Sequence, residues 1–307
     1  MQPDQNQQVL REDILELKKE RGAVILAHNY QIPQIQDIAD YLGDSLELSK
    51  ISRNLKSEPI VFCGVRFMAE TAKILSPDKK VLLPAEDAGC PMADMIEPQQ
   101  LSELKRKHPD AWAVSYVNTP AAIKALSDVC CTSSNAVSVV KNVPTKKVIF
   151  TPDRNLGWWV RKNVPEKEII LWDGFCLVHE YFSLEDLKRV RQLYPEAEIL
   201  VHPECRREVL EAADYVLSTA GMLKQAKASK TRTIIVGTEE GHIYRLRKDN
   251  PGKEFFSLGC GRTCINMKRT TLEVLYRALK EEVYEINLDK EIIDKAKIAL
   301  ERMVEYV

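Results

Sequence analysis

One pattern occurs three times along the 307 residues, and this internal repeat constrains the fold more than any other feature. Residues 23–30, 113–118 and 199–204 are apolar runs that end in polar side chains. When these runs are aligned, each copy has a polar tip residue, an aspartate twelve residues later, a hydroxyl seventeen residues later and a closing cysteine. In chain order these positions are His28, Asp40, Ser45 and Cys90; Tyr116, Asp128, Ser133 and Cys176; and His202, Asp214, Thr219 and Cys264. The copies are far longer than solenoid repeats of about 20–50 residues, so each is large enough to be a small domain.

Each copy alternates strand-like runs with segments of helical spacing, and further strand-like runs lie at residues 60–62, 148–150 and 234–236. This alternation is typical of βαβ units with parallel sheet. We therefore predict an α/β fold made of three small domains related by a pseudo-threefold. The predicted domains are 1–90, 91–177 and 178–264, followed by a helical segment, 265–307, that packs back on the assembly.

The first copy shows how such a unit is expected to begin. Residues 23–26 predict a buried strand, so His28 and Tyr30 are expected where that strand opens into a loop. Helical spacing then predicts a helix whose apolar face is Ile35, Ile38, Ala39 and Leu42. Ser45 is expected to begin the next helix, because Asp44 and Glu47 stand in capping-box register.

Composition excludes several classes of protein. Lys and Arg number 44 and Asp and Glu 45, so there is no basic surplus that favours nucleic acid. No apolar run approaches the roughly 20 residues that a membrane helix needs. Residues 1–8 are polar and Gln-rich, which predicts a disordered tail without a signal peptide. We therefore expect a cytoplasmic protein that acts on small molecules.

The eight cysteines predict a metal centre rather than a disulfide framework, because a long chain in a reducing compartment seldom carries disulfides. Three thiolates, Cys90, Cys176 and Cys264, are too few for a closed structural zinc site. They suit an iron-sulfur cluster that keeps one iron open as a Lewis acid. The apolar surroundings of Cys63, Cys130 and Cys131 predict buried structural thiols; the roles of Cys205 and Cys260 stay open.

Two interpretations stay open for the other repeated polar residues. Ser45, Ser133 and Thr219 are expected as helix N-caps, and three such helix starts aimed at one centre would also bind anions. The strand-tip residues are general acid and base groups near a Lewis acid, or packing and capping residues. They are His28, Tyr30, Tyr116, Asn118, His202 and Glu204. Asp40, Asp128 and Asp214 favour a structural role in capping or turn formation.

Ten short motifs, in order along nearly the whole chain, resemble the quinolinate synthase family. They are Leu26-Ala27-His28-Asn29-Tyr30, Gly43-Asp44-Ser45, Cys90-Pro91-Met92-Ala93, Tyr116-Val117-Asn118, Thr132-Ser133-Ser134-Asn135-Ala136, Pro152-Asp153-Arg154-Asn155-Leu156-Gly157, Cys176-Leu177-Val178-His179, His202-Pro203-Glu204-Cys205, Gly237-Thr238-Glu239 and Cys264-Ile265-Asn266-Met267-Lys268. Their order and spacing make the resemblance specific. Some members of that family carry a CxxC pair near the last ligand, whereas here three residues separate Cys260 from Cys264, so we expect no regulatory disulfide.

The resemblance implies three αβα sandwich domains around a central active site and a 4Fe-4S cluster. It implies a transferase of de novo NAD biosynthesis that condenses iminosuccinate with dihydroxyacetone phosphate to give quinolinate, phosphate and water. L-aspartate oxidase is then a candidate supplier of iminosuccinate. The implied cluster ligands are Cys90, Cys176 and Cys264. The implied substrate-contacting residues are His28, Ser45, Tyr116, Asn118, Ser133, His202, Glu204 and Thr219, and Tyr30 is the implied active-site tyrosine.

Four of these residues are expected to be catalytic. We expect Glu204, partnered by His202, to be the general base, and Tyr30 with His28 to hold the triose and assist its isomerisation. The two carboxylates of iminosuccinate and the phosphate of the triose match the three predicted helix starts in number, but the sequence leaves open which start binds which group.

Tyr116 and Asn118 are expected to orient carboxylates of the intermediate. Two rival functions stay open: a cluster-bearing redox sensor, and a hydro-lyase of another hydroxy acid that uses an open cluster iron.

Overall fold

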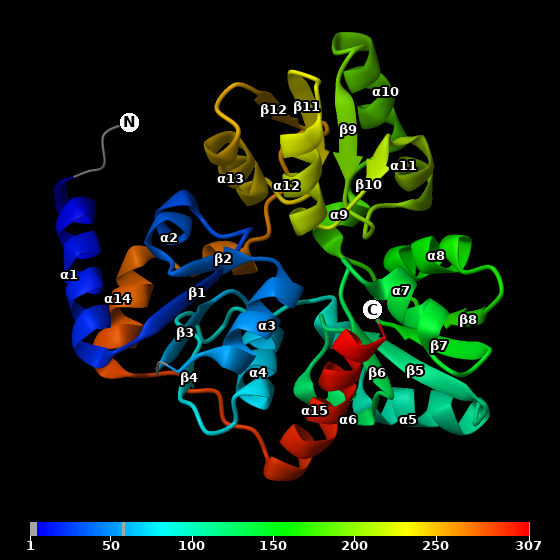
Figure 1. Cartoon of the computed structure of the whole chain (residues 1–307), viewed down its shortest axis with the longest axis horizontal. Coiled ribbons are helices and arrows are strands. Elements are labelled where there is room, and N and C mark those ends of the chain that lie inside the picture. The colour runs from blue at the N-terminus through cyan, green and yellow to red at the C-terminus, as the bar shows by residue number, and fades with distance from the viewer. Residues whose placement is uncertain (1–4, 57–58, 307) are drawn as a thin grey trace. The chain divides into compact units, whose positions relative to one another are not determined.

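The computed structural model describes residues 5–56 and 59–306, and the chain forms two compact units. Within the described residues, the first unit consists of residues 5–90 and 264–293, and the second of residues 91–263 and 294–306. Figure 1 shows the course of the chain through both.

The first unit contains one parallel four-stranded sheet, ordered β2-β1-β3-β4. The strands are β1 (Val24–His28), β2 (Tyr41–Gly43), β3 (Ile60–Cys63) and β4 (Val81–Leu82). The helices of this unit are α1 (Gln5–Arg21), α2 (Pro33–Ile38), α3 (Ser45–Asn54), α4 (Arg66–Leu75), η2 (Asn266–Lys268) and α14 (Leu272–Glu281). Ile14 of α1 and Leu275 of α14 are buried in one apolar cluster with Ile25 of β1, and α1 lies beside α14 (Figure 1).

The second unit contains two parallel four-stranded sheets, ordered β6-β5-β7-β8 and β10-β9-β11-β12. The strands are β5 (Ala111–Tyr116), β6 (Val129–Cys131), β7 (Lys147–Thr151), β8 (Glu168–Leu171), β9 (Glu198–Val201), β10 (Tyr215–Val216), β11 (Thr233–Gly237) and β12 (Glu254–Ser257). The helices are η1 (Ala93–Met95), α5 (Pro98–Lys107), α6 (Ala121–Leu126), α7 (Ala136–Asn142), α8 (Arg154–Asn163), α9 (Leu177–Glu180), α10 (Leu184–Leu193), α11 (Arg207–Ala212), α12 (Thr219–Ala228) and α13 (Gly241–Asp249).

The last helix, α15 (Lys290–Glu305), contacts the sheet of β5 through its C-terminal part. Its Arg302 donates from Nη1 to the carbonyl oxygen of Asp128 at 2.9 Å, and its guanidinium lies 5.3 Å from the centre of the Trp112 ring. Asn135 donates to the carbonyl oxygen of Met303 at 3.1 Å. The C-terminal helix is thus held against the second copy of the repeat by hydrogen bonds as well as by packing.

The three sheets share one strand order, which confirms the predicted α/β fold with three parallel-sheet sandwich units. Equivalent elements also begin at equivalent positions: α2, α6 and α11 start at Pro33, Ala121 and Arg207, five residues after the three tip residues. The second strand of each sheet was not predicted, since each is only two or three residues long. A segment that short carries too few alternating side chains to reveal a strand.

The repeated aspartates explain why each copy turns where it does. In the second copy, Asp128 accepts a hydrogen bond from the backbone N–H of Ala113 through Oδ2 at 2.8 Å, and its own N–H donates to the carbonyl of Ala113 at 2.9 Å. The same carboxylate lies 3.0 Å from Nζ of Lys105 on α5. The equivalent sets are Asp40 with Ile25 and Lys18, and Asp214 with Ile199 and Arg191. These three residues, the clamp aspartates, have the predicted structural role.

Three local expectations were wrong. Residues 5–8 lie in α1 instead of a disordered tail, because glutamine is a good helix former and the apolar face of α1 begins at Leu10; residues 1–4 lie outside the described chain. The helix expected to reach Leu42 ends at Ile38, since Ala39 is extended and Asp40 turns the chain into β2.

The predicted N-cap residues are also displaced by one or more positions. The cap of α3 is Asp44, which forms the predicted capping box with Glu47, and Ser45 is the first helical residue. Ser218 caps α12. Asn135 precedes α7, so Ser133 lies in the turn before that helix. Asp44 and Ser218 accept hydrogen bonds from the N–H groups of Glu47 and Gly221, whereas the side chain of Asn135 forms no cap hydrogen bond.

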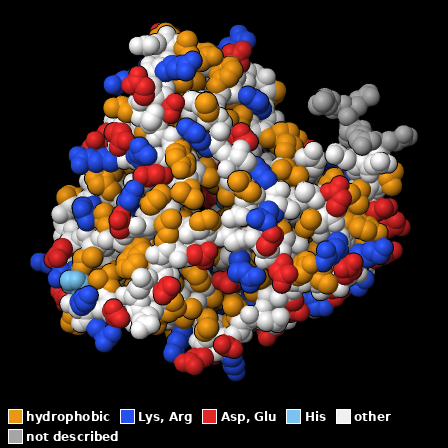
Figure 2. Space-filling view, turned by 180° about the vertical axis from the view of Figure 1, so that it is seen from behind, with side chains coloured by type: hydrophobic (Ala, Val, Ile, Leu, Met, Phe, Trp, Pro, Cys, Tyr) orange, Lys and Arg blue, Asp and Glu red, His pale blue; other side chains and the backbone are white. Residues whose placement is uncertain are grey.

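Charged side chains of both signs are interspersed on the face shown in Figure 2, in keeping with the net charge of −1. None of the helices in the described part of the chain is long and apolar enough to span a membrane.

Candidate functional site

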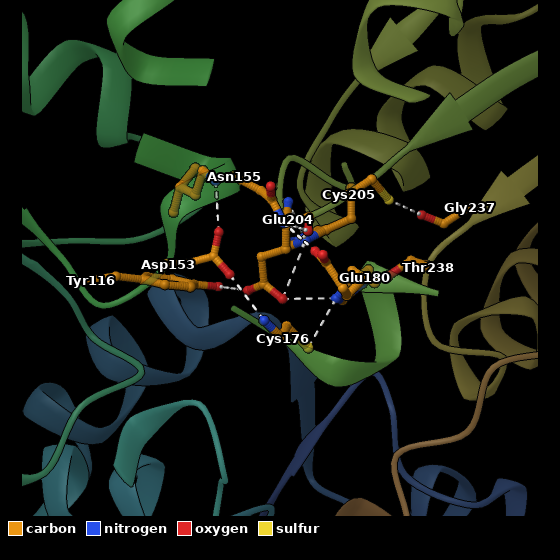
Figure 3. A network of polar contacts seen from close by, with 12 residues as sticks. Tyr116, Asp153, Asn155, Cys176, Glu180, Glu204, Cys205, Gly237 and Thr238 are labelled. Carbon is orange, nitrogen blue, oxygen red and sulfur yellow. Dashed lines mark hydrogen bonds and ion pairs between the residues drawn. The ribbon is translucent and has the colours of Figure 1, made fainter. Parts of the chain in front are cut away.

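A buried cluster of polar side chains joins the second and third copies of the repeat within the second unit (Figure 3). Tyr116, at the end of β5, donates its hydroxyl hydrogen to Oε1 of Glu204 at 2.7 Å. Oε2 of the same carboxylate lies 2.7 Å from Nδ1 of His179 and 3.8 Å from Nδ1 of His202. All four side chains are almost fully buried. A carboxylate is thus placed between a phenol and two imidazoles, away from bulk water.

His179 connects this carboxylate to two further groups. Its Nδ1 lies 3.2 Å from Sγ of Cys176, and its Nε2 lies 2.8 Å from the hydroxyl of Thr238. Its ring stacks on that of His202 with the ring centres 4.6 Å apart. Contacts at both nitrogens and on one ring face leave the imidazole a single orientation.

The neighbours of Glu204 hold its pKa well below the ordinary range. Burial by itself would raise this pKa, but the positive charges available on His179 and His202 and the hydrogen bonds from His179 and Tyr116 outweigh it. A second buried carboxyl, Asp153, has its pKa raised well above the usual range by burial and then by the charge of Glu204. The pKa values of the two carboxyls are thereby shifted in opposite directions.

Asp153 and Asn155 fix the backbone around the cluster. Asp153 caps α8 by accepting from the N–H of Leu156 at 2.7 Å, and its other oxygen accepts from the N–H of Cys176 at 3.1 Å. Asn155 donates to the carbonyl oxygen of Glu204 at 3.1 Å. One helix start therefore positions both the cysteine and the carboxylate.

The first unit presents a matching strand tip at the end of β1. His28 is buried, and its ring meets that of Tyr30 edge-on with centres 4.5 Å apart. Lys268 donates from Nζ to the carbonyl oxygen of Tyr30 at 2.5 Å, and Gln31 donates to Sδ of Met267 at 3.6 Å. The tip is thus packed against the segment that follows Cys264.

The segment before Cys90 is tied to the same region of the first unit. Asp87 forms an ion pair with Arg269, five residues after Cys264. The segment before Cys90 and the segment after Cys264 are therefore joined within the first unit.

The three hydroxyl residues have different surroundings. Thr219 is buried at the start of α12, whereas Ser45 and Ser133 are partly exposed. Ser134, next to Ser133, lies 2.9 Å from Ser218 through their Oγ atoms, which joins the turn before α7 to the start of α12. Two of the predicted hydroxyl positions, Ser133 and Thr219, thus lie on adjoining segments of the second unit.

Burial separates the cysteines into two groups. Cys90, Cys176 and Cys264 are partly exposed and Cys260 is exposed, and none of the eight forms a disulfide. Cys63, Cys130, Cys131 and Cys205 are buried, as predicted for the first three. Burial raises the pKa of the Cys130 thiol to about 12 and raises those of the other three as well. These four stay protonated near neutral pH and are poor metal ligands.

The three repeat cysteines, which are the predicted cluster ligands, are each partly exposed and form no disulfide. A mononuclear ion is a second possibility for part of the site: the ligand atoms of Cys176, His179 and Glu204 lie within 4.8 Å of one another. The 2.7 Å contact between His179 and Glu204 is, however, a hydrogen-bond distance that already uses both of these atoms.

Asn118, directly after β5, supplies independent evidence of a bound polar group. Its Oδ1 is buried and has no hydrogen-bond partner among residues 5–56 and 59–306. Because buried polar atoms are almost always paired, this oxygen is expected to accept a hydrogen bond from a ligand or an ordered water.

The structure brings four of the predicted site residues together: Tyr116, Cys176, His202 and Glu204. It adds four residues that were not predicted to take part: Asp153, Asn155, His179 and Thr238. All four occur in the motifs that carry the family resemblance. The three-residue spacing from Cys176 to His179 was the signal available, since this spacing places both side chains on one side of a helical turn.

Comparison with known proteins agrees with this constellation. A family model described as Quinolinate synthetase A protein matches residues 12–305. A relative named Quinolinate synthase from Caldicellulosiruptor saccharolyticus is 53% identical over 296 residues, which cover 96% of this chain and 98% of the relative. Another of that name, from Aquifex aeolicus, is 50% identical over 301 residues, covering 96% and 94%.

A third Quinolinate synthase, from Thermodesulfovibrio yellowstonii, is 53% identical over 293 residues, covering 95% of this chain and 97% of the relative. The solved E-1-hydroxy-2-methyl-but-2-enyl-4-diphosphate reductase of Plasmodium falciparum overlaps with a TM-score of 0.30 at 14% identity, covering 89% of this chain and 93% of that one, and this likeness is too small to bear on the fold. Matches of this length to the family model and to its named members establish that the chain belongs to the Quinolinate synthetase A protein family.

Proposed function

We propose that this protein is a quinolinate synthase, a transferase of NAD biosynthesis that condenses iminosuccinate with dihydroxyacetone phosphate to quinolinate, phosphate and water. The observation that carries the proposal is the buried arrangement of Tyr116, Glu204 and His179, which supplies acid and base groups beside a partly exposed cysteine. A redox sensor has no need of such an arrangement, because it does not transfer protons to and from a carbon substrate.

We propose Cys90, Cys176 and Cys264 as the ligands of a 4Fe-4S cluster. The accessibility of these three thiols and the raised pKa values of the four buried ones support this choice. A cluster with three protein ligands supplies one Lewis-acidic iron for a substrate oxygen or nitrogen. Asp153 accepts from the backbone N–H of Cys176, so it holds the main chain at the position of that proposed ligand.

Glu204 is the proposed general base. Its lowered pKa keeps it ionised, and the hydrogen bonds from Tyr116 to Oε1 and from His179 to Oε2 hold the carboxylate in place. His179 lies closer to Glu204 than the predicted partner His202 does, so we assign to His179 the larger share in orienting it. His202, stacked on His179, is the proposed second imidazole of the acid and base group.

The remaining predicted residues are proposed to bind substrate. Tyr30 and His28 hold the triose, and their edge-to-face contact fixes both rings. Asn118 orients a carboxylate or imine of the intermediate. Its unpaired Oδ1 can only accept a hydrogen bond, so the group that meets this oxygen must be a donor, such as the imine N–H. Ser45, Ser133 and Thr219 remain proposed contacts for the three anionic groups, without assignment of each group to one residue.

We also propose that the enzyme acts in the cytoplasm and receives iminosuccinate from L-aspartate oxidase. Iminosuccinate hydrolyses readily in water, so a nearby oxidase that supplies it would favour condensation over loss.

The decisive experiment is anaerobic reconstitution with iron and sulfide, followed by an assay for quinolinate from freshly generated iminosuccinate and dihydroxyacetone phosphate. Quinolinate formation that depends on both substrates supports the proposal, and a fully reconstituted protein that makes none refutes it. Cys90→Ser, Cys176→Ser and Cys264→Ser are expected to lose the cluster absorbance, whereas Cys260→Ser, at an exposed position outside the repeat register, should keep it.

A further inference from the structure

Lys124 has a buried position that is unusual for a lysine. It lies on α6, its relative exposure is 0%, and it is among the largest fully buried side chains of the chain. Lysine is almost never fully buried without a partner, because its charged form is strongly hydrated. A specific contact must therefore keep this side chain inside the second copy of the repeat.

That contact is with the turn that carries two proposed site residues. Nζ of Lys124 donates to the carbonyl oxygen of Thr119, and the hydroxyl of Thr119 donates to the carbonyl oxygen of Tyr116 at 3.0 Å. The Tyr116 hydroxyl in turn donates to Glu204 at 2.7 Å. Lys124 thus lies at the far end of a chain of hydrogen bonds that ends at the proposed base.

In the first copy of the repeat, an uncharged side chain makes the equivalent contact. Gln36 occupies the position equivalent to Lys124, and Gln31 the position equivalent to Thr119. Nε2 of Gln36 donates to the carbonyl oxygen of Gln31 at 2.8 Å and to that of Asn29 at 3.2 Å. A donor from the middle of the short helix therefore holds the loop after the first strand in both copies.

The third copy shows that the fold itself does not require such a donor. The equivalent residues are Leu210 and Cys205, which are buried in one apolar cluster. The sheet order and the bounds of the short helix α11 are nevertheless those of the other copies. A buried lysine at position 124 is thus a feature of the second strand tip and not of the architecture.

The positive charge of Lys124 also reaches the neighbouring strand. Burial raises the pKa of the Cys130 thiol on β6 to about 12, and the charge of Lys124 partly opposes this rise. Lys124 thus contacts the turn after β5 and also acts electrostatically on Cys130 of β6.

We propose that Lys124 is a positioning residue for the site: it fixes the turn 116–119 so that the Tyr116 hydroxyl and the Asn118 side chain stay aligned with Glu204. This inference rests on the proposed function for its consequence in turnover, and its structural part, the coupling of Lys124 to Tyr116, can be tested without turnover.

The first test is a double-mutant cycle in the unfolding equilibrium with Lys124→Met and Tyr116→Phe. If Lys124 positions Tyr116, Tyr116→Phe should destabilise the Lys124→Met protein less than it destabilises the wild type. The two effects on the unfolding equilibrium constant should differ by about threefold or more. Additive effects overturn the proposal. Lys105→Met is the matched control, because Lys105 is a lysine of the same copy that contacts Leu126 and Asp128 and not the turn.

The second test is turnover of the reconstituted enzyme. Lys124→Met should lower kcat about tenfold or more with little change in KM, because misplaced catalytic groups slow the chemical step. Lys124→Gln, which copies the first repeat, should restore kcat to within about threefold of wild type, since the hydrogen bond rather than the charge fixes the turn. Wild-type kcat in Lys124→Met, or no recovery in Lys124→Gln, overturns the proposal.

The two tests distinguish a failure of this proposal from a failure of the proposed function. A wild-type enzyme that makes no quinolinate refutes the function and leaves the cycle as the test of positioning. Should Lys124→Met fail to fold, the cycle and the assay are carried out with Lys124→Gln and Lys124→Leu, the solutions of the first and third copies, and equal kcat in these two overturns the proposal.

Discussion

Tyr116 and Glu204 lie 88 residues apart in the chain, yet the hydroxyl of one donates to the carboxylate of the other at 2.7 Å inside the second unit. Each residue lies at the tip of the first strand of its own sheet. This hydrogen bond therefore joins two copies of the repeat. It also buries a phenol and a carboxylate away from solvent.

Replacing Tyr116 with Phe is expected to leave Glu204 with one hydrogen bond fewer and to cost about 1.5–3 kcal/mol of unfolding free energy, as for hydrogen bonds to charged groups. The kcat for quinolinate should fall about tenfold to a hundredfold. Chemical denaturation and steady-state assays check both, with Tyr194→Phe as control, because Tyr194 stacks on Phe256 away from the cluster. Unchanged stability and kcat would contradict the assigned role of the hydroxyl.

Replacing Thr238 with Val removes the partner of Nε2 of His179 at nearly constant volume. We expect a loss of about 1 kcal/mol in stability and a lower kcat, because the imidazole is no longer held in one orientation. Thr231→Val is the matched control, since that hydroxyl contacts Glu198 at the start of β9 and not His179. A kcat equal to that of the control would show that Thr238 does not position His179.

Thiol reactivity should follow burial. At pH of about 8, iodoacetamide is expected to modify Cys260 and the three repeat cysteines of the cluster-free protein, because thiols react as thiolates. Cys63, Cys130, Cys131 and Cys205 should react only after denaturation, since their pKa values are raised by burial. Mass spectrometry of peptides before and after denaturation distinguishes the two groups, and rapid labelling of Cys130 in the native protein would contradict the assignment.

The lowered pKa of Glu204 predicts a specific acid sensitivity. Above the ordinary glutamate pKa of about 4.3, both folded and unfolded chains carry the charge, and the stabilisation is complete. Below that pH the unfolded chain takes up the proton first, so the stabilisation declines as pH falls toward the lower folded pKa. Wild type should therefore lose unfolding free energy more steeply than Glu204→Gln between pH values of about 5 and 3. Parallel slopes would contradict the assigned pKa.

The clamp aspartates should be important for stability and not for chemistry. Asp128→Ala removes the acceptor for the N–H of Ala113 and is expected to cost about 1–2 kcal/mol, with the partly exposed contact to Lys105 adding little. The KM for both substrates should stay at the wild-type value. Asp128→Asn, which keeps an acceptor, should recover most of the stability, as thermal unfolding can show; a large rise in KM would instead indicate a role in the site.

Much of this architecture could be predicted from the sequence because the repeated positions mark strands and helix starts that depend on local sequence. The central strands of each sheet are apolar runs, and the capping box of Asp44 and Glu47 marks the start of α3 correctly. The short second strands could not be predicted, since β2 is determined by the turn at Asp40 and its pairing with β1 rather than by its own composition.

Several residues of the site could be predicted from the sequence, but the contacts between them could not. The register identified Tyr116, His202 and Glu204, yet the histidine closest to Glu204 is His179, which lies outside the register and was not expected to take part. The sequence alone does not show that the helical turn after Cys176 brings the imidazole of His179 to the carboxylate of Glu204, which follows a strand of another sheet. Lys124 was missed for a related reason: a lysine in an amphipathic helix is normally solvated, and its burial depends on a backbone carbonyl it meets only after folding.

Because each clamp aspartate closes its turn from behind, at the opposite end of the loop from the tip residue, the anchoring of the loop is independent of the side chains displayed there. Duplicated genes could thus have acquired a histidine or a tyrosine at equivalent tips without losing the scaffold that carries them. The same separation makes the three loops interchangeable parts for protein engineering: a tip sequence grafted from one copy to another should keep its backbone path as long as the aspartate, its basic partner and any donor from the short helix, such as Gln36 or Lys124, are retained.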